Sequence, residues 1–204
     1  MTRHLPEQAR REQILKAARL CFIENGYHPT RMDDIARAAD LSKGGVYFHF
    51  KSKADVFASL VEAEYAKSIG FLRRVMEAKT SIAEKMQFIG RHYLEYFEAA
   101  PEAPRFFIVM GEMALRDEAL AARLLEMQRS FIDTVHQLLD EGARAGIVRD
   151  RVDTLVVAAM LKALLDGLEG LKALEYPMDV SQFLTTGIEL VMRGMASTEG
   201  PGQD

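Results

Sequence analysis

The chain has 204 residues, of which 49% are hydrophobic, with one cysteine and a net charge of −4. This length can bury a core of its own, and the single Cys21 excludes an internal disulfide. The longest stretch free of Asp, Glu, Lys and Arg runs from Val180 to Ile188, far short of the roughly 20 residues of a membrane-spanning helix. The polar first residues are not typical of a secretion signal, so we expect a cytoplasmic protein without membrane contact.

The charge is unevenly distributed. Residues 1–53 contain ten Lys or Arg and six Asp or Glu, a net charge of +4, whereas residues 54–204 carry −8. A basic end on an otherwise acidic chain indicates a nucleic-acid-facing segment, although the same imbalance is compatible with an ordinary solvated surface.

Helical periodicity dominates the chain. Between Gln13 and Glu24 the apolar residues recur at helical spacing, and Asn25-Gly26 supplies a stop. Thr30, Ser42 and Ser52 can each cap a following helix. The other helices are expected at about 31–38, 43–50, 53–76, 81–99, 103–114, 118–145, 152–175 and 179–196. The predicted fold is therefore all-α with about nine helices and a disordered tail at 197–204.

The two short helices within residues 30–53 predict a helix-turn-helix at about 31–50. In the second of them Val46 and Phe50 form a narrow apolar stripe, which leaves the other faces free for a partner. Gly44 and Gly45 each cost about 1 kcal/mol in a helix, which indicates a close approach to a large partner such as DNA. Each feature alone is also typical of an ordinary surface, cap or helix contact, but together they favour DNA binding.

This segment resembles the TetR family of bacterial transcription regulators over about residues 8–60. The resemblance rests on Phe22, Asn25-Gly26-Tyr27, Thr30, Asp34-Ile35-Ala36, Ala39 and the run Leu41-Ser42-Lys43-Gly44-Gly45-Val46-Tyr47-Phe48-His49-Phe50-Lys51-Ser52-Lys53. It implies a DNA-binding domain at residues 1–53, a ligand-binding and dimerisation domain at residues 54–196, and dimerisation through the last two helices. The DNA contacts that it implies are Thr30, Arg31, Ser42, Lys43, Gly44, Tyr47, Phe48, His49 and Lys53.

Three positions depart from the family pattern. Asp40 replaces the usual turn glycine, but Asp tolerates the left-handed conformation. Arg31 stands where a small hydroxyl residue is common and could give a longer phosphate contact. Asp33 stands where some members have a basic residue that reads guanine, and a carboxylate cannot donate to guanine, so base reading by the first helix of the motif is in doubt.

The helix expected at 152–175 is apolar on nearly every side, and such a helix must be covered all round. One face can pack on its own core and the other on a partner, so we expect a twofold homodimer. A central helix of a monomer would explain the same pattern. The predicted interface residues are Leu155, Val156, Ala159, Gly167, Leu171, Leu184, Ile188 and Val191.

The resemblance also implies a small-molecule effector that lowers DNA affinity. Bulky and flexible side chains between helices could line its pocket, although most such residues are ordinary core. The candidates are Phe106, Met110, Glu112, Met113, Phe131 and Met160, of which Glu112 is the candidate polar contact.

An enzyme, a cofactor and a metal site are not expected. The sequence has no phosphate-binding glycine loop, zinc spacing or nucleophile elbow, and the pair Asp133 and His136 has no second pair to complete a di-metal site. The sequence therefore favours a ligand-responsive homodimeric repressor that a small molecule releases from a pseudo-palindromic operator. The alternative is a helical small-molecule-binding or nucleoid-associated adaptor that keeps the DNA-binding fold without acting as a switch.

Overall fold

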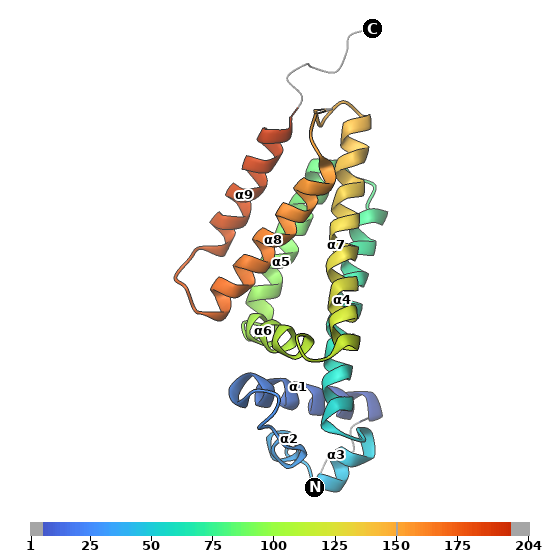
Figure 1. Cartoon of the computed structure of the whole chain (residues 1–204), viewed down its shortest axis with the longest axis vertical. Coiled ribbons are helices and arrows are strands. Elements are labelled where there is room, and N and C mark those ends of the chain that lie inside the picture. The colour runs from blue at the N-terminus through green and yellow to red at the C-terminus, as the bar shows by residue number, and fades with distance from the viewer. Residues whose placement is uncertain (1–5, 150, 197–204) are drawn as a thin grey trace. The chain divides into compact units, whose positions relative to one another are not determined.

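The computed structural model describes residues 6–149 and 151–196, and these ranges fold into α-helices without a β-strand (Figure 1). The helices are α1 (Glu7–Asn25), α2 (Met32–Ala38), α3 (Lys43–His49), α4 (Lys53–Glu77), α5 (Ile82–Ala99), α6 (Ala103–Ala114), α7 (Glu118–Arg144), α8 (Thr154–Ala173) and α9 (Val180–Met195). Each expected helix is present, which confirms the all-α fold class. The tail predicted to be disordered at 197–204 lies outside the described residues.

The first helix is longer than its apolar pattern indicates. It begins at Glu7, and its first two turns are held by polar side chains, because Gln8 donates to Glu12 at 3.1 Å and Arg10 to Gln13 at 2.9 Å. Apolar periodicity reports only the part of a helix that faces a core, so these solvent-facing turns were missed.

The predicted caps are confirmed at two helices and corrected at a third. Ser42 Oγ accepts from the Gly45 amide at 3.1 Å, and Ser52 Oγ accepts from the Asp55 amide at 3.1 Å. Thr30 does not cap α2. Its hydroxyl points inward, at 3.1 Å from the Cys21 carbonyl oxygen and 2.7 Å from that of Gly26.

The turn between α2 and α3 is built on Asp40, whose φ of 53° lies in the left-handed region. The Leu41 amide then donates to the Ala36 carbonyl at 2.9 Å, which closes the end of α2. The prediction that Asp preserves this turn is confirmed.

The helices divide into two compact units, which are described separately. Unit 1 runs to Lys67 and includes Arg105–Leu124, whereas unit 2 contains Ser68–Pro104 and the chain from Leu125 onward. This packing boundary differs from the predicted functional boundary at residue 53, because the first turns of α4 and most of α6 pack on the core of unit 1. That core includes Ile14, Phe22, Ile35, Val46, Phe50, Phe57, Phe106 and Met110.

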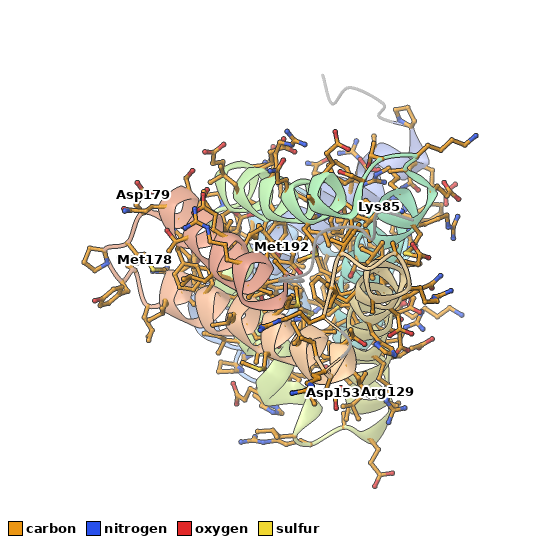
Figure 2. All side chains as sticks on the ribbon, turned by 90° about the horizontal axis from the view of Figure 1, so that it is seen from above. Lys85, Arg129, Asp153, Met178, Asp179 and Met192 are labelled. Atoms are coloured by element: carbon orange, nitrogen blue, oxygen red, sulfur yellow. The ribbon has the colours of Figure 1, made fainter. Side chains whose placement is uncertain are left out.

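Unit 2 is a helical bundle in which α8 and α9 run antiparallel (Figure 1). Viewed from above, α9 lies beside both α5 and α8 (Figure 2). Gly90 of α5 permits a close approach to α9, since a Cβ at this position would lie 2.6 Å from Ile188 Cδ1. Within the described residues no helix is long and apolar enough to cross a membrane.

Candidate nucleic-acid interface

The second helix of the motif, α3, is anchored from one side only. Val46 and Phe50 are fully buried in the core of unit 1. From α1, Arg11 donates to the His49 carbonyl oxygen at 2.8 Å, and its guanidinium lies 4.2 Å from the centre of the Phe50 ring. These contacts fix the end of α3 and leave its opposite face to solvent.

The free face of α3 carries Lys43, Gly44, Tyr47 and Phe48, all of which are exposed. Phe48 is 81% exposed, although it is among the large apolar residues that are most often buried. Its ring lies edge-on to His49 at 5.0 Å between centroids. The structure therefore brings five of the nine predicted DNA contacts together along one short helix.

Gly44 has no packing role within unit 1. A Cβ built at this position would meet no atom within 4 Å, whereas one at Gly45 would lie 3.3 Å from Ser42 Oγ. The contacts within the protein therefore leave room for a side chain at Gly44.

Lys43 is paired with Asp33 of α2, whose carboxylate lies 2.9 Å from the lysine Nζ. The hydrogen bond and charge of Asp33 raise the pKa of Lys43, so its ammonium stays protonated. Both side chains are more than half exposed. The pair holds Lys43 at the start of α3 and places a carboxylate beside its ammonium.

Lys53 uses its ammonium within the protein. Nζ donates to the carbonyl oxygens of Tyr27 at 2.6 Å, His28 at 2.9 Å and Thr30 at 2.8 Å. It also lies 4.4 Å from the centre of the Tyr27 ring. An ammonium has three protons, so these carbonyls use its full donor capacity. Burial lowers the pKa of Lys53, in agreement with a half-buried position.

The remaining predicted DNA contacts differ in accessibility. Arg31 is exposed at the start of α2, where its backbone amide donates to Asp34 at 2.9 Å. Thr30 is only 2% exposed, which leaves its side chain without a path to a phosphate. Ser42 is exposed, and its hydroxyl caps α3.

The predicted ligand residues are not gathered at one site. Phe106, Met110 and Met113 lie in the core of unit 1, whereas Glu112 is exposed and lies 3.9 Å from Arg116. Met160 is also exposed. Of the six candidates only Phe131 lines the cavity of unit 2.

That cavity has a volume of about 520 Å³ and lies among α5, α7, α8 and α9. The sequence pattern did not reveal it, because periodicity identifies the buried face of each helix but not whether neighbouring faces fill the space between them. The signal in the sequence that could have indicated the cavity is a pair of glycines in its lining, Gly90 and Gly187.

The predicted dimer residues fall into two groups. Leu155, Val156, Ala159 and Gly167 are exposed on α8, and Leu171 is half-buried. Three further candidates on α9 line the cavity of their own chain, namely Leu184, Ile188 and Val191.

Comparison with known proteins assigns the family. Residues 14–60 match the family model described as "Bacterial regulatory proteins, tetR family", and residues 82–193 match the one described as "BetI-type transcriptional repressor, C-terminal". The second match alone spans more than half of the chain. The protein belongs to the TetR family of bacterial transcription regulators.

Individual relatives agree with this assignment. The HTH-type transcriptional repressor AcnR of Corynebacterium diphtheriae is 27% identical over 78% of this chain and 78% of its own length. The HTH-type transcriptional activator FasR of Mycolicibacterium smegmatis is 25% identical over 69% of this chain and 64% of its own. The structure of SmeT from Stenotrophomonas maltophilia in complex with triclosan superposes with a TM-score of 0.75 and 25% identity, covering 96% of this chain and 97% of SmeT.

These proteins are transcription regulators rather than enzymes. The chain is accordingly a DNA-binding transcription regulator of this family. The sequence-based prediction of its family and function class is confirmed.

Proposed function

We propose that the protein is a repressor without catalytic activity that binds a pseudo-palindromic operator in the bacterial cytoplasm. Each subunit of the dimer places α3 in the major groove of one half-site. The observation that carries this proposal is the exposed face of α3, on which Lys43, Gly44, Tyr47 and Phe48 lie together while Val46 and Phe50 anchor the helix.

The proposed roles divide the residues into those that contact DNA and those that hold the helix-turn-helix in position. Lys43 and Tyr47 meet base edges, Gly44 allows the sugar-phosphate backbone to approach, and Phe48 packs at the groove wall. Arg31 and His49 contact phosphates beside α3. Thr30, Ser42 and Lys53, whose polar groups bond within the protein, position the motif. Residues 1–53 then serve as the DNA-binding domain and residues 54–196 as the regulatory domain.

The proposed dimer interface lies on α8 and α9. An exposed apolar face runs along α8 through Leu155, Val156, Met160 and Leu164, and α9 adds Leu190. Of these residues, Leu164 and Leu190 also line the cavity of unit 2. A large exposed apolar face on a soluble helix pair indicates a protein contact. A second copy of the chain would cover it by twofold symmetry.

The DNA-binding proposal is tested by filter binding against operator DNA selected from a random pool and against unselected DNA. With six to ten phosphates contacted per dimer, affinity should fall about 10³–10⁵-fold between 50 and 200 mM salt. Lys43→Ala and Tyr47→Ala should each lose about 1–3 kcal/mol of discrimination between the two DNAs. Lys51→Ala, an exposed lysine just beyond α3, is the matched control.

A preference below about tenfold for every selected sequence would favour the alternative of a nucleoid-associated adaptor without a switching role. Repression itself is measured by transcription in vitro from a promoter that overlaps the operator. A rise in transcript on adding the protein would identify an activator, the role that FasR has by name.

A further inference from the structure

The cavity of unit 2 has an apolar interior. Met86 and Ile89 of α5 and Phe131 and Val135 of α7 form its inner wall, and each of these side chains is at most 5% exposed. A cavity of about 520 Å³ lies within the range of roughly 300–1,000 Å³ that is typical of small-molecule sites. Its size and apolar lining fit a ligand rather than a few ordered waters.

Polar side chains occur along a single edge of this cavity. Asp179, Gln182 and Thr186 follow one another at spacings of three and four residues on one face at the start of α9, and all three are exposed. Figure 2 labels Asp179 and the adjacent Met178, which also lines the cavity, at this end of α9. Among the described residues, a ligand can therefore make polar side-chain contacts only along α9 and its N-cap.

Among the residues that the structure describes, none of those lining the cavity is Lys, Arg or His. A buried ammonium does occur on α8, but Lys162 is paired with Asp166 and does not line the cavity. Within the described part of the chain, the only charged side chain in the lining is Asp179, which already accepts a hydrogen bond from the Gln182 amide at 2.9 Å. An anionic head group would find no counter-charge there and would be repelled by the carboxylate.

The cavity can also be filled from within. Gly187 of α9 lines it, and a Cβ at this position would meet no atom within 4 Å. A side chain at Gly187 would therefore begin in open space, and it would improve the helix propensity of α9. Gly194 on the same helix is equally uncrowded but lies outside the lining, which makes it a matched control.

We propose that this cavity is the effector site and that its ligand is an uncharged, largely apolar molecule with one hydrogen-bonding end. The apolar body lies against α5 and α7, and the polar end meets Asp179, Gln182 and Thr186. The assignment as an effector site rests on the proposed function, whereas the binding of such a molecule does not.

Binding is measured on the full-length protein without DNA, with the uncharged fluorophore N-phenyl-1-naphthylamine as the probe. 1-Dodecanol should displace the probe at a concentration at least about tenfold lower than dodecanoate, which has the same chain length and a negative charge. Gly187→Leu should weaken probe binding at least about tenfold, and Gly194→Leu should leave it unchanged. The titrations of the wild-type protein with 1-dodecanol and with dodecanoate test the proposal even if Gly187→Leu fails to fold.

Equal displacement by dodecanoate, or wild-type probe binding by a folded Gly187→Leu, would overturn the proposal. Saturating 1-dodecanol should also lower operator affinity at least about fivefold in the wild-type protein but not in Gly187→Leu. Probe binding without any effect on operator affinity would overturn the effector assignment. A protein that binds the probe but no DNA would instead contradict the proposed function.

Discussion

At the scale of single residues, Lys53 shows how position along the chain and three-dimensional contact can point to different roles. It lies just after α3, and the family resemblance of this segment implies that Lys53 contacts a phosphate. In the structure its three protons are directed to the carbonyls of Tyr27, His28 and Thr30, in the loop between α1 and α2. Sequence reasoning could place the charge correctly but could not identify these partners, because they lie more than 20 residues away in the chain.

We therefore expect Lys53→Met to destabilise the protein without removing a phosphate contact. Three carbonyls would lose a charged donor, and the expected cost is about 1–3 kcal/mol in urea unfolding. The slope of log affinity against log salt should stay that of the wild-type protein, since loss of a phosphate contact would reduce it by about one. Lys51→Met, which alters an exposed lysine, should change stability by less than about 0.5 kcal/mol. An unchanged stability together with a smaller salt slope would show instead that Lys53 contacts a phosphate of the DNA.

At the scale of the elements, the helices were predictable because their signals are local. The serine that caps α3 and the Asp at the α2–α3 turn act through bonds to residues only a few positions away. Which helix faces pack against one another could not be predicted from such local signals. Phe106 and Met110 have the periodicity of a core, and nothing in the sequence distinguishes the core of unit 1 from the wall of a cavity in unit 2.

The contact between α5 and α9 gives a prediction at this scale. Gly90→Ala would place a methyl 2.6 Å from Ile188 Cδ1 in the present geometry, an overpacking that costs about 1–3 kcal/mol against a gain of up to about 1 kcal/mol in helix propensity. Ile188→Val removes that Cδ1 atom. In a double-mutant cycle by urea unfolding, the second substitution should be less costly in the Gly90→Ala background by at least about 0.5 kcal/mol.

Gly111→Ala in α6, where a Cβ meets no atom within 4 Å, is the control and should not couple to Ile188→Val. Strict additivity of Gly90→Ala and Ile188→Val would mean that α5 and α9 do not touch at Gly90 in solution.

At the scale of the whole molecule, the dimer determines whether DNA is bound well. The two copies of α3 in the dimer must reach DNA half-sites that are about one turn of the double helix, or a multiple of it, apart. The exposed apolar face of α8 is the surface from which we infer the contact, and Met160, at 60% exposure, lies on it without lining the cavity. The sequence predicted that α8 must be covered on all sides but did not show which of the α9 residues face their own chain.

Met160→Glu should consequently give a monomer at concentrations at which the wild-type protein is a dimer, because an unpaired carboxylate would be buried in an apolar interface. Sedimentation measures the change, and operator affinity should fall by at least about 100-fold. Probe binding would report whether the cavity itself survives. Leu115→Glu alters another exposed apolar residue, 87% exposed in unit 1, and should leave sedimentation unchanged. A dimeric Met160→Glu would place the interface elsewhere.

The single cysteine offers an intrinsic reporter of local opening. Cys21 is buried in the core of unit 1, and its burial raises the pKa of the thiol. Because the chain has no other thiol, a thiol-specific reagent labels only Cys21, and it does so when α1 separates from its neighbours. The labelling rate therefore measures the opening equilibrium of the DNA-binding motif directly. Slower labelling on operator DNA would give the free energy with which DNA binding holds this motif closed.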